Sequence, residues 1–469
     1  MSSSNGLEHD LRALLEESAV VTAERDHYQK GYRYGEGRTA AIVRPSTTSQ
    51  VREIVRYCHA QQLAILPQGA HTGLVGAATP RPEADELLLS LERLNMVSDY
   101  APLDRTITCG AGTLLSTVNE YARDDGLFFP IDLSADPSIG GMVATNTGGA
   151  KLFRYGDVRK NLLGLEIVLV DEDATLWTDL DGLRKDNTGL DLKQMFVGSG
   201  GKFAIITAAT LNLHPVPRQS SSALLVPKSL SDAPQIISRL ENQLGELIVA
   251  CEGMSGDAMA VALRHHPALQ NPFGPTAPPS FAMLVEAASS VPPGNGLEIE
   301  TLLADSLWPM MEGTDACLDD ALLTGSGDFW AIRHAISDGL KRQGRVLAFD
   351  ISTRRSSLPA LIDRLTALTA DIAPNALPCH FGHFGDGGVH FNLVLSSNRP
   401  FNEEHLREEV YAILVGEFSG SISAEHGIGP FNQTYYDRHV PAWKRNAALE
   451  LQRMFDPASL LDRSNGYAA

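Results

Sequence analysis

Cysteine is scarce in this chain, which has five cysteines in 469 residues and no CxxC pair. An odd number of scattered cysteines argues against a disulfide framework, and we expect reduced thiols. The N-terminus has neither a basic nor an apolar stretch, so we expect no secretory signal and a cytoplasmic protein. No apolar run reaches the roughly eighteen residues that a membrane-spanning helix needs.

Positive charge is also in deficit, because 38 basic residues face 57 acidic ones and the net charge is -19. Such a chain has no surplus of cations to neutralise phosphates, so nucleic acid is not expected as a partner. An anionic substrate would be repelled by the general field and would need a local cationic group. The length suggests about two to four domains.

Strand-like and helical segments follow one another without regular βαβ spacing, which predicts an α+β fold. Helices are expected from Val51, over 114–122 and over 445–454, and strands over 63–66, 106–109, 205–213 and 346–351. Pro215-Val216-Pro217 reads as a hinge between domains. No internal repeat is visible.

Two glycine-rich clusters stand in the N-terminal half, at residues 67–76 and 137–149. Glycine has no Cβ and tolerates positive φ, so backbone N–H groups in such loops can converge on an anion. The nearest match to a Rossmann fingerprint, at residues 35–40, follows polar sequence rather than a hydrophobic strand, so we do not interpret it as one.

The C-terminal half carries a group of potential metal ligands. His383 and His390 flank a glycine-rich turn, and Glu425 follows later in the chain. Two imidazoles and a carboxylate can fill three positions around a divalent metal and leave one open, and they suit zinc, manganese, iron or cobalt. His380 is a less favoured candidate ligand.

These clusters, continued through residues 154–156 and 163–169, resemble the FAD-binding domain of the vanillyl-alcohol oxidase (PCMH-type) superfamily. Residues 183–192 and the histidine segment are similar to its D-2-hydroxyglutarate and D-lactate dehydrogenase branch. The resemblance implies a two-subdomain FAD-binding domain and an α+β substrate domain with an antiparallel sheet and a C-terminal helical segment. We assign an N-terminal helical segment and three further parts, at residues 1–36, 37–217, 218–395 and 396–469, the last completing the active site.

The resemblance also implies that the glycine clusters hold the pyrophosphate of FAD. The cofactor-binding residues expected on this basis are Pro67, Gly69, Ala70, His71, Thr72, Gly73, Gly76, Pro137, Ser138, Gly140, Gly141, Ala144, Thr145, Asn146, Gly148, Gly149, Tyr155, Gly156 and Ile206. A histidine near His71 is bonded to the flavin in some members of the superfamily. Packing of His71 on the flavin without a bond is the favoured alternative.

Further roles come from the same resemblance. Glu425 is expected to be a metal ligand and His426 the catalytic base, and Arg333 is expected to bind the substrate carboxylate. An arginine can make two directional hydrogen bonds to a carboxylate. Ser337, one helical turn beyond Arg333, and Asn392 are further candidate substrate contacts.

Ala348 departs from the pattern of the hydroxyglutarate-oxidising relatives, which carry a lysine there. If that lysine pairs with a distal carboxylate, this chain has lost the partner and should have a weaker preference for a five-carbon diacid. Residues 198–202 and 462–465 also differ from the motifs of the family.

The implied activity is oxidation of a D-2-hydroxy acid, such as D-2-hydroxyglutarate or D-lactate, to the 2-oxo acid by hydride transfer to flavin N5. An oxidase that uses O₂ on another hydroxy acid is an alternative, and a metal-dependent hydrolase is an alternative from another class. The electron acceptor could be an electron-transfer flavoprotein, a quinone or O₂. A homodimer could form.

Overall fold

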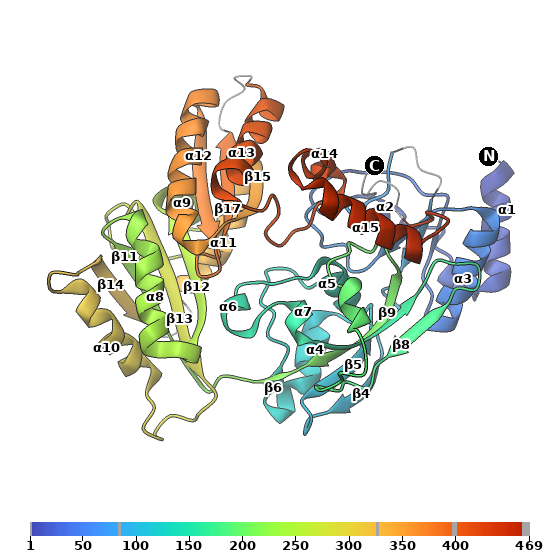
Figure 1. The fold of residues 1–469 in the computed structure, drawn as a ribbon, viewed down its shortest axis with the longest axis horizontal. Coiled ribbons are helices and arrows are strands. Elements are labelled where there is room, and N and C mark those ends of the chain that lie inside the picture. Colours follow the sequence, from blue (N-terminus) through green and yellow to red (C-terminus); the bar gives the residue numbers. More distant parts are fainter. Residues whose placement is uncertain (1, 83–85, 325–327, 396–400, 462–469) are drawn as a thin grey trace. The chain divides into compact units, whose positions relative to one another are not determined.

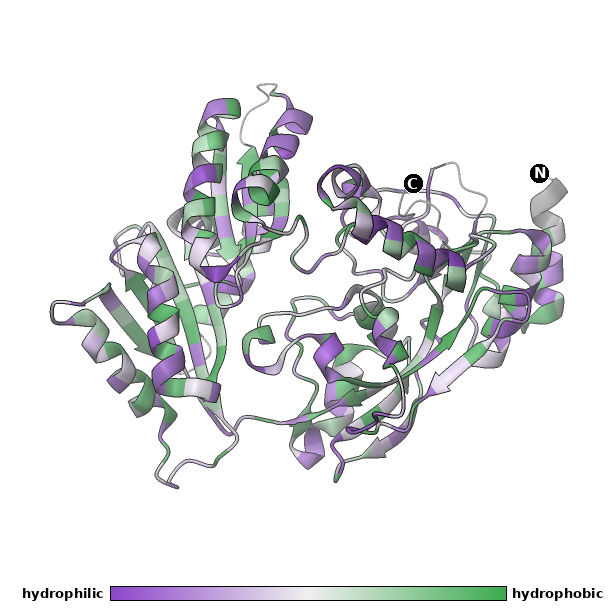
Figure 2. Cartoon of the chain, viewed as in Figure 1, coloured by the Kyte–Doolittle hydropathy of each residue, from purple (hydrophilic) through white to green (hydrophobic). Residues whose placement is uncertain are grey.

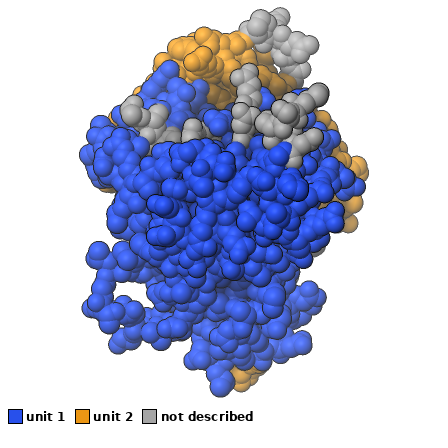
Figure 3. Space-filling model, turned by 90° about the vertical axis from the view of Figure 1, so that its right-hand side faces the viewer, with its two compact units in different colours: residues 1–148, 157–215, 425–469 blue, residues 149–156, 216–424 orange. Residues whose placement is uncertain are grey.

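The computed structural model describes residues 2–82, 86–324, 328–395 and 401–461. It divides the chain into two compact units, coloured separately in Figure 3. Unit 1 comprises residues 1–148, 157–215 and 425–469, and unit 2 comprises residues 149–156 and 216–424. Residues 462–465, noted above for their departure from the family motif, lie outside the described residues.

Unit 1 contains two principal sheets (Figure 1). The first is parallel, with strand order β1 (Ala41–Val43), β3 (Leu87–Ser90) and β2 (Ile65–Gln68). The second is antiparallel, with strand order β4 (Val97–Ala101), β5 (Thr106–Gly110), β9 (Ile205–Asn212), β7 (Leu162–Val168) and β8 (Leu176–Asp179). A two-stranded pair joins β6 (Leu127–Phe128) to β10 (His214–Pro215).

The helices of unit 1 connect and cover these sheets, and one hydrophobic cluster runs through them. Helix α3 (Thr48–Gln61) links β1 to β2; it begins where the Thr47 side chain accepts from Gln50 N and ends at Gln62, which has a φ of 51°. The other helices are α1 (Ser2–Leu14), α2 (Asp26–Gln29), α4 (Leu115–Ala122), α5 (Ile139–Thr145), α7 (Val158–Asn161), α14 (Gly429–His439) and α15 (Ala442–Phe455).

The C-terminal segment of the described chain is bound into unit 1. Asp456 is fully buried and accepts hydrogen bonds from the backbone N–H groups of Leu460 and Leu461 at 2.9 and 3.0 Å. Ile65 of β2 in turn donates its backbone N–H to the Leu460 carbonyl at 2.6 Å. A carboxylate that accepts two backbone N–H groups thus fixes this segment beside the parallel sheet.

Unit 2 is built on one antiparallel sheet of seven strands. Their spatial order is β14 (Leu318–Thr324), β11 (Gln219–Pro227), β13 (Phe281–Ser289), β12 (Ile248–Ser255), β16 (Ala376–Gly382), β17 (Gly388–Leu395) and β15 (Arg345–Ser352). The sheet consists of two similar halves. In one half β13 lies between β11 and β12, and in the other half β17 lies between β15 and β16, so in both the third strand along the chain lies between the first two. The halves meet where β12 pairs with β16.

Helices cover this sheet, whose strands are largely green in Figure 2 while the helices alternate green and purple. Helices α9 (Gly256–His265) and α11 (Asp328–Gln343) pack on one face, in a cluster that includes Cys379 and Phe381. On the other face Phe349 packs against Tyr411 of α13 (Glu403–Phe418), with ring centroids 5.7 Å apart. The remaining helices of unit 2 are α6 (Leu152–Tyr155), α8 (Ala233–Leu244), α10 (Ile299–Met311) and α12 (Leu358–Ile372).

The expected α+β class and the antiparallel sheet of the C-terminal half are therefore confirmed. All five cysteines are free and buried, and burial raises the pKa of Cys58 and Cys379 to about 12, so these thiols stay protonated. None of the helices in the described parts of the chain combines the length and apolar character needed to cross a bilayer.

His380 of β16 is unusual because its imidazole ring lies in an apolar environment. Its ring is stacked between Phe281 and Phe391, with centroids 6.1 and 6.4 Å away. Both ring nitrogens are shielded from water and have no hydrogen-bond partner among the described residues. Burial therefore lowers the pKa of His380 to about 4.

This pKa predicts a loss of stability in acid. Between about pH 6.5 and pH 4 the unfolded state binds a proton at His380 that the folded state excludes, so stability falls as the pH falls through this window. His380→Phe removes this proton uptake. The difference in unfolding free energy between the variant and wild type should therefore shift by about 2 kcal/mol in favour of the variant on going from pH 8 to pH 5. Urea unfolding followed by circular dichroism at both pH values measures this difference.

The control is Leu347→Ala on β15, which is 1% exposed and carries no titratable group. It should change stability by the same amount at both pH values. A pH-independent effect of His380→Phe would contradict the prediction.

Candidate functional site

Charged side chains gather on one face of the unit 2 sheet, the face that α11 covers. Asp350 of β15 pairs with His390 of β17, which in turn pairs with Phe381 of β16. Side chains of paired residues in adjacent strands point to the same face, so Asp350, His390 and Phe381 share it. Arg333 reaches this face from α11, since its guanidinium carbon lies 4.7 Å from the centre of the Phe381 ring.

The two imidazoles that the sequence predicts as metal ligands lie together. The ring centroids of His383 and His390 are 5.2 Å apart, with the rings close to perpendicular. Nδ1 of His390 lies 3.5 Å from an Asp350 carboxylate oxygen, and Nδ1 of His383 lies 3.3 Å from Oε1 of Glu252. The hydrogen bond of His383 with Glu252 favours the His383 tautomer with the proton on Nδ1, so its lone pair is on Nε2, the nitrogen that would bind a metal.

Glu252 of β12 also binds Arg333. Arg333 Nε donates to Oε2 of Glu252 at 2.5 Å, and Glu252 is 1% exposed. Burial alone would raise the pKa of Glu252, but the charge of Arg333 and the hydrogen bonds from Arg333 and His383 outweigh burial and hold the pKa below its usual range. Because Nε is occupied, pairing of Arg333 with a second carboxylate falls to its two terminal nitrogens.

The two other predicted substrate contacts differ in exposure. Ser337 is exposed on α11, one turn after Arg333. Asn392 of β17 is 6% exposed, lies opposite Ala348 of β15, and donates through Nδ2 to the His390 carbonyl at 3.2 Å. Asn392 therefore stands two residues from His390 on the same face of the sheet.

The segment that leads to Glu425 runs beside β15. Ser421 pairs with Ser352 through backbone hydrogen bonds of 2.8 and 3.2 Å, and Ala424 donates its N–H to the Asp350 carbonyl at 3.0 Å. Ala424 is the last residue of unit 2, and Glu425 and His426 begin the final segment of unit 1. Nε2 of His426 lies 3.7 Å from the Glu425 carboxylate.

Asp350 and Glu252 were not predicted as site residues. Asp350 occurs in an ordinary strand pattern, and only the strand register reveals that it lies opposite His390. Glu252 did leave a signal, because it is the one charged residue within the apolar strand Ile248–Ser255. Carboxylates are rarely fully buried unless they are paired.

In unit 1 the two glycine clusters touch each other. Ala70 N donates to the Ser138 hydroxyl at 3.2 Å, and a Cβ on Gly69 would lie 2.1 Å from that oxygen. Within the described residues, the backbone N–H groups of residues 71–74 donate to no protein acceptor. A loop with unused N–H groups and glycine at its closest approach fits the pyrophosphate of FAD.

His71 lies on this loop with a φ of 56°. Its Nε2 is 3.4 Å from the Thr79 hydroxyl, and burial lowers the pKa of His71. The His71 imidazole is therefore neutral near pH 7. A covalent link from His71 to the flavin stays a prediction.

The second cluster is divided between the units. Residues 137–148 and Ile206 belong to unit 1, whereas Gly149, Tyr155 and Gly156 belong to unit 2. Asn146 has its amide engaged with the protein, donating to Asp157 at 2.7 Å and accepting from Arg159 N at 2.9 Å. Asn146 thus holds the turn after the cluster, in addition to any role toward the cofactor.

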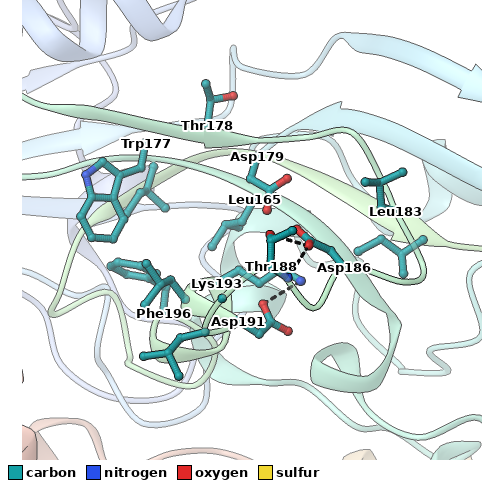
Figure 4. Close-up of a pocket in the computed structure, with 15 residues that line it drawn as sticks. Leu165, Trp177, Thr178, Asp179, Leu183, Asp186, Thr188, Asp191, Lys193 and Phe196 are labelled. Carbon is teal, nitrogen blue, oxygen red and sulfur yellow. Dashed lines mark hydrogen bonds and ion pairs between the residues drawn. The ribbon is translucent and has the colours of Figure 1, made fainter.

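A pocket of about 270 Å³ lies beside β7 and β8 in unit 1 (Figure 4). Trp177 and Phe196 line one side of it, and residues 186–193 line another. Thr188 donates to Asp186 through its N–H and its hydroxyl, which lowers the pKa of Asp186, and Lys193 pairs with Asp191 at 2.7 Å. These polar groups are satisfied within the segment, and none of the predicted catalytic residues lines the pocket.

Comparison with known proteins agrees with this geometry. Residues 39–178 match the FAD binding domain, and residues 216–465 match the C-terminal domain of FAD linked oxidases. A mitochondrial D-2-hydroxyglutarate dehydrogenase of Bos taurus is 34% identical over 438 residues, covering 91% of this chain and 76% of the relative. A putative mitochondrial D-lactate dehydrogenase of Schizosaccharomyces pombe is 31% identical, covering 91% and 81%.

A solved structure supports the fold. The chain resembles p-cresol methylhydroxylase with a TM-score of 0.73 and 15% identity, covering 98% of this chain and 97% of that one. At this identity the likeness concerns the fold alone. It agrees with the PCMH-type resemblance stated from the sequence.

The expectation of a cytoplasmic protein is contradicted by the names of the relatives. The bovine, rat and rice proteins are all named as mitochondrial. Our expectation depended on the lack of a secretory signal, and that lack does not distinguish one compartment inside the cell from another.

The matched domains cover most of the chain, and relatives at 30% identity or more extend over nine-tenths of it. The two glycine clusters both lie within the residues that match the FAD binding domain, and they are in contact. The chain therefore belongs to the FAD linked oxidases, in the branch of the D-2-hydroxyglutarate and D-lactate dehydrogenases.

Proposed function

We propose that this protein oxidises a D-2-hydroxy acid to the 2-oxo acid, with FAD and a divalent metal. The observation that carries the proposal is the convergence, on one sheet face, of an arginine whose side chain is 11% exposed and two imidazoles whose Nδ1 atoms lie 3.3 and 3.5 Å from carboxylate oxygens. FAD, when bound, supplies the acceptor for the hydride. A divalent metal, when bound, supplies a Lewis acid that lowers the pKa of a coordinated hydroxyl.

His383, His390 and Glu425 would hold the metal. The Glu252 carboxylate at Nδ1 orients the His383 imidazole, as the hydrogen-bonded partners of metal-binding histidines commonly do, and an Asp350 oxygen lies 3.5 Å from Nδ1 of His390. Glu425 follows Ala424 directly, and the bond from Ala424 to the Asp350 carbonyl brings the chain to the edge of β15 just before Glu425. Asp350 also offers a ligand oxygen and is a further candidate. Zinc fits this donor set, as do manganese, iron and cobalt.

Arg333 would bind the substrate carboxylate through its terminal nitrogens, because Glu252 holds Nε and fixes the direction of the guanidinium. Asn392, on the same sheet face, and Ser337, one turn along α11, are the proposed polar contacts beside it. His426 would take the hydroxyl proton as the general base. Such a base commonly contributes about 10²–10⁴ in rate.

Ala348 bears on the identity of the substrate. It lies on the sheet face of Asn392 and Asp350, where it offers only a methyl group. A second carboxylate reaching this part of the face would find no cation among the β15 residues there, which are Val346, Ala348, Asp350 and Ser352. We therefore propose that a hydroxy acid with an uncharged tail, such as D-lactate, is used at least as well as D-2-hydroxyglutarate. The electron acceptor and a homodimer stay predictions.

The proposal is tested by anaerobic reduction of the bound flavin. The purified protein should show the visible absorption of a flavin, and a D-2-hydroxy acid should bleach it while the L enantiomer does not. Re-admission of O₂ then separates a dehydrogenase, which reoxidises slowly, from an oxidase. A flavin that no member of a panel of D-2-hydroxy acids bleaches would contradict the proposed function.

The role of His426 predicts a loss of turnover with the cofactor retained. Glutamine cannot accept the proton, so His426→Gln should lower kcat by about 10²–10⁴, with the flavin spectrum unchanged. Steady-state kinetics and the flavin content of the same preparation measure both. The matched control is His59→Gln on α3, which should retain wild-type kcat; near-normal turnover in His426→Gln would refute the assignment.

The role of Ala348 predicts a change in specificity. A lysine at this position would supply a charge-assisted hydrogen bond to a distal carboxylate, which is worth about 1.5–3 kcal/mol. Ala348→Lys should therefore raise kcat/KM for D-2-hydroxyglutarate relative to D-lactate by about tenfold or more. Ala348→Met, similar in length but uncharged, should not, and an equal ratio in both variants would refute the idea.

A further inference from the structure

Glu252 is the one charged residue of strand β12. It lies on β12, between Cys251 and Gly253, and only 1% of it is exposed. Removing a carboxylate from water is costly unless its oxygens are hydrogen-bonded. Both oxygens of Glu252 have partners, and the two partners have different proposed tasks.

Each oxygen of Glu252 serves one partner. Oε2 accepts from Nε of Arg333 at 2.5 Å, and Oε1 lies 3.3 Å from Nδ1 of His383. The first contact directs the guanidinium proposed to bind the substrate carboxylate. The second directs an imidazole proposed to bind the metal and favours the tautomer that presents Nε2.

The strand junction is shaped to make these contacts. Gly253 pairs with Gly382 across β12 and β16, so the residues next to the pair, Glu252 and His383, are neighbours. A Cβ on Gly253 would lie 2.3 Å from the buried Phe384 ring, and a Cβ on Gly382 would lie 3.0 Å from the His390 ring. The two glycines thus allow the aromatic and imidazole rings to pack at the junction.

We propose that Glu252 is a positioning residue that holds Arg333 and His383 in one arrangement, so that carboxylate binding and metal binding are coupled through a single side chain. This inference depends on the proposed function. Its consequence is that loss of Glu252 weakens both kinds of binding, although Glu252 touches neither the metal nor the substrate.

The informative variant is Glu252→Gln, which keeps the shape but not the two acceptors. An amide has one acceptor oxygen and one NH₂ group, so it can serve Arg333 or His383 but presents a donor to the other. Glu252→Asp keeps two acceptor oxygens on a shorter side chain. The matched control is Glu286→Gln on β13. Glu286 is also buried, at 8% exposed, and it accepts from Nε1–H of Trp330 at 2.7 Å, a bond that an amide oxygen can keep.

The experiment measures two affinities on FAD-loaded protein that has been stripped of metal. Co²⁺ is titrated and followed by its ligand-field absorption, and pyruvate is titrated against the flavin spectrum of the Co²⁺-loaded protein. We expect Glu252→Gln to lower the Co²⁺ affinity by about 10–100-fold and to lower the pyruvate affinity as well. Glu252→Asp sets the carboxylate back by one methylene from both partners, so it should lose part of both affinities, though less than Glu252→Gln. Glu286→Gln should retain wild-type values.

A merely structural ion pair would behave differently. Glu252→Gln would then lower the unfolding midpoint while the folded protein kept wild-type affinities for Co²⁺ and pyruvate, and that result would overturn the proposal. If Glu252→Gln does not fold, wild-type affinities in Glu252→Asp overturn it equally. Wild-type protein that takes up no Co²⁺ would overturn the metal arm of the proposal.

Failure of the proposed function has a separate signature. In that case wild-type protein binds Co²⁺ but no D-2-hydroxy acid bleaches its flavin. The Co²⁺ affinities of wild type, Glu252→Gln and Glu286→Gln would still decide whether Glu252 orients His383.

Discussion

The pairing of β12 with β16 is the constraint on which the candidate site depends. Each of these strands borders its own half of the sheet, and neither half alone brings together the residues of the site. Glu252 comes from one half, whereas His383, His390 and Asp350 come from the other. A slip of one residue in this register would turn Glu252 to the opposite face of the sheet.

The charges around the site account for a feature that composition alone made puzzling. A protein with a net charge of -19 needs a local cation to attract an acid, yet Arg333 is already paired with Glu252. Arg333, Glu252, Asp350 and the proposed ligand Glu425 sum to two negative charges when all are ionised. A divalent cation would neutralise that charge, which is why we regard the metal as what permits an acid to approach and Arg333 as the source of direction.

Local patterns in the sequence predicted much of the fold. The spacing of Val51, Ile54 and Val55 predicted the helix that became α3, and the apolar run at 346–351 predicted β15. The histidine pair could be predicted because its members are separated by one turn of chain. Partners distant in the sequence could not be, since the contact of Glu252 with His383 depends on a strand register that a single sequence does not reveal. The two similar halves of the unit 2 sheet could not be predicted either, because no internal sequence repeat accompanies them.

The short excursion of residues 149–156 into unit 2 has a consequence for dissecting the protein. Phe153 packs close to Gly385 and Cys251, and Arg154 donates to the Ala288 carbonyl at 2.7 Å, so these residues are part of that unit's interior. The polypeptide passes from one unit to the other at four peptide bonds, after residues 148, 156, 215 and 424. No contiguous clone can therefore encode a whole unit without residues of the other, and a fragment that starts at Val216 would lack residues 149–156, which lie about sixty residues upstream.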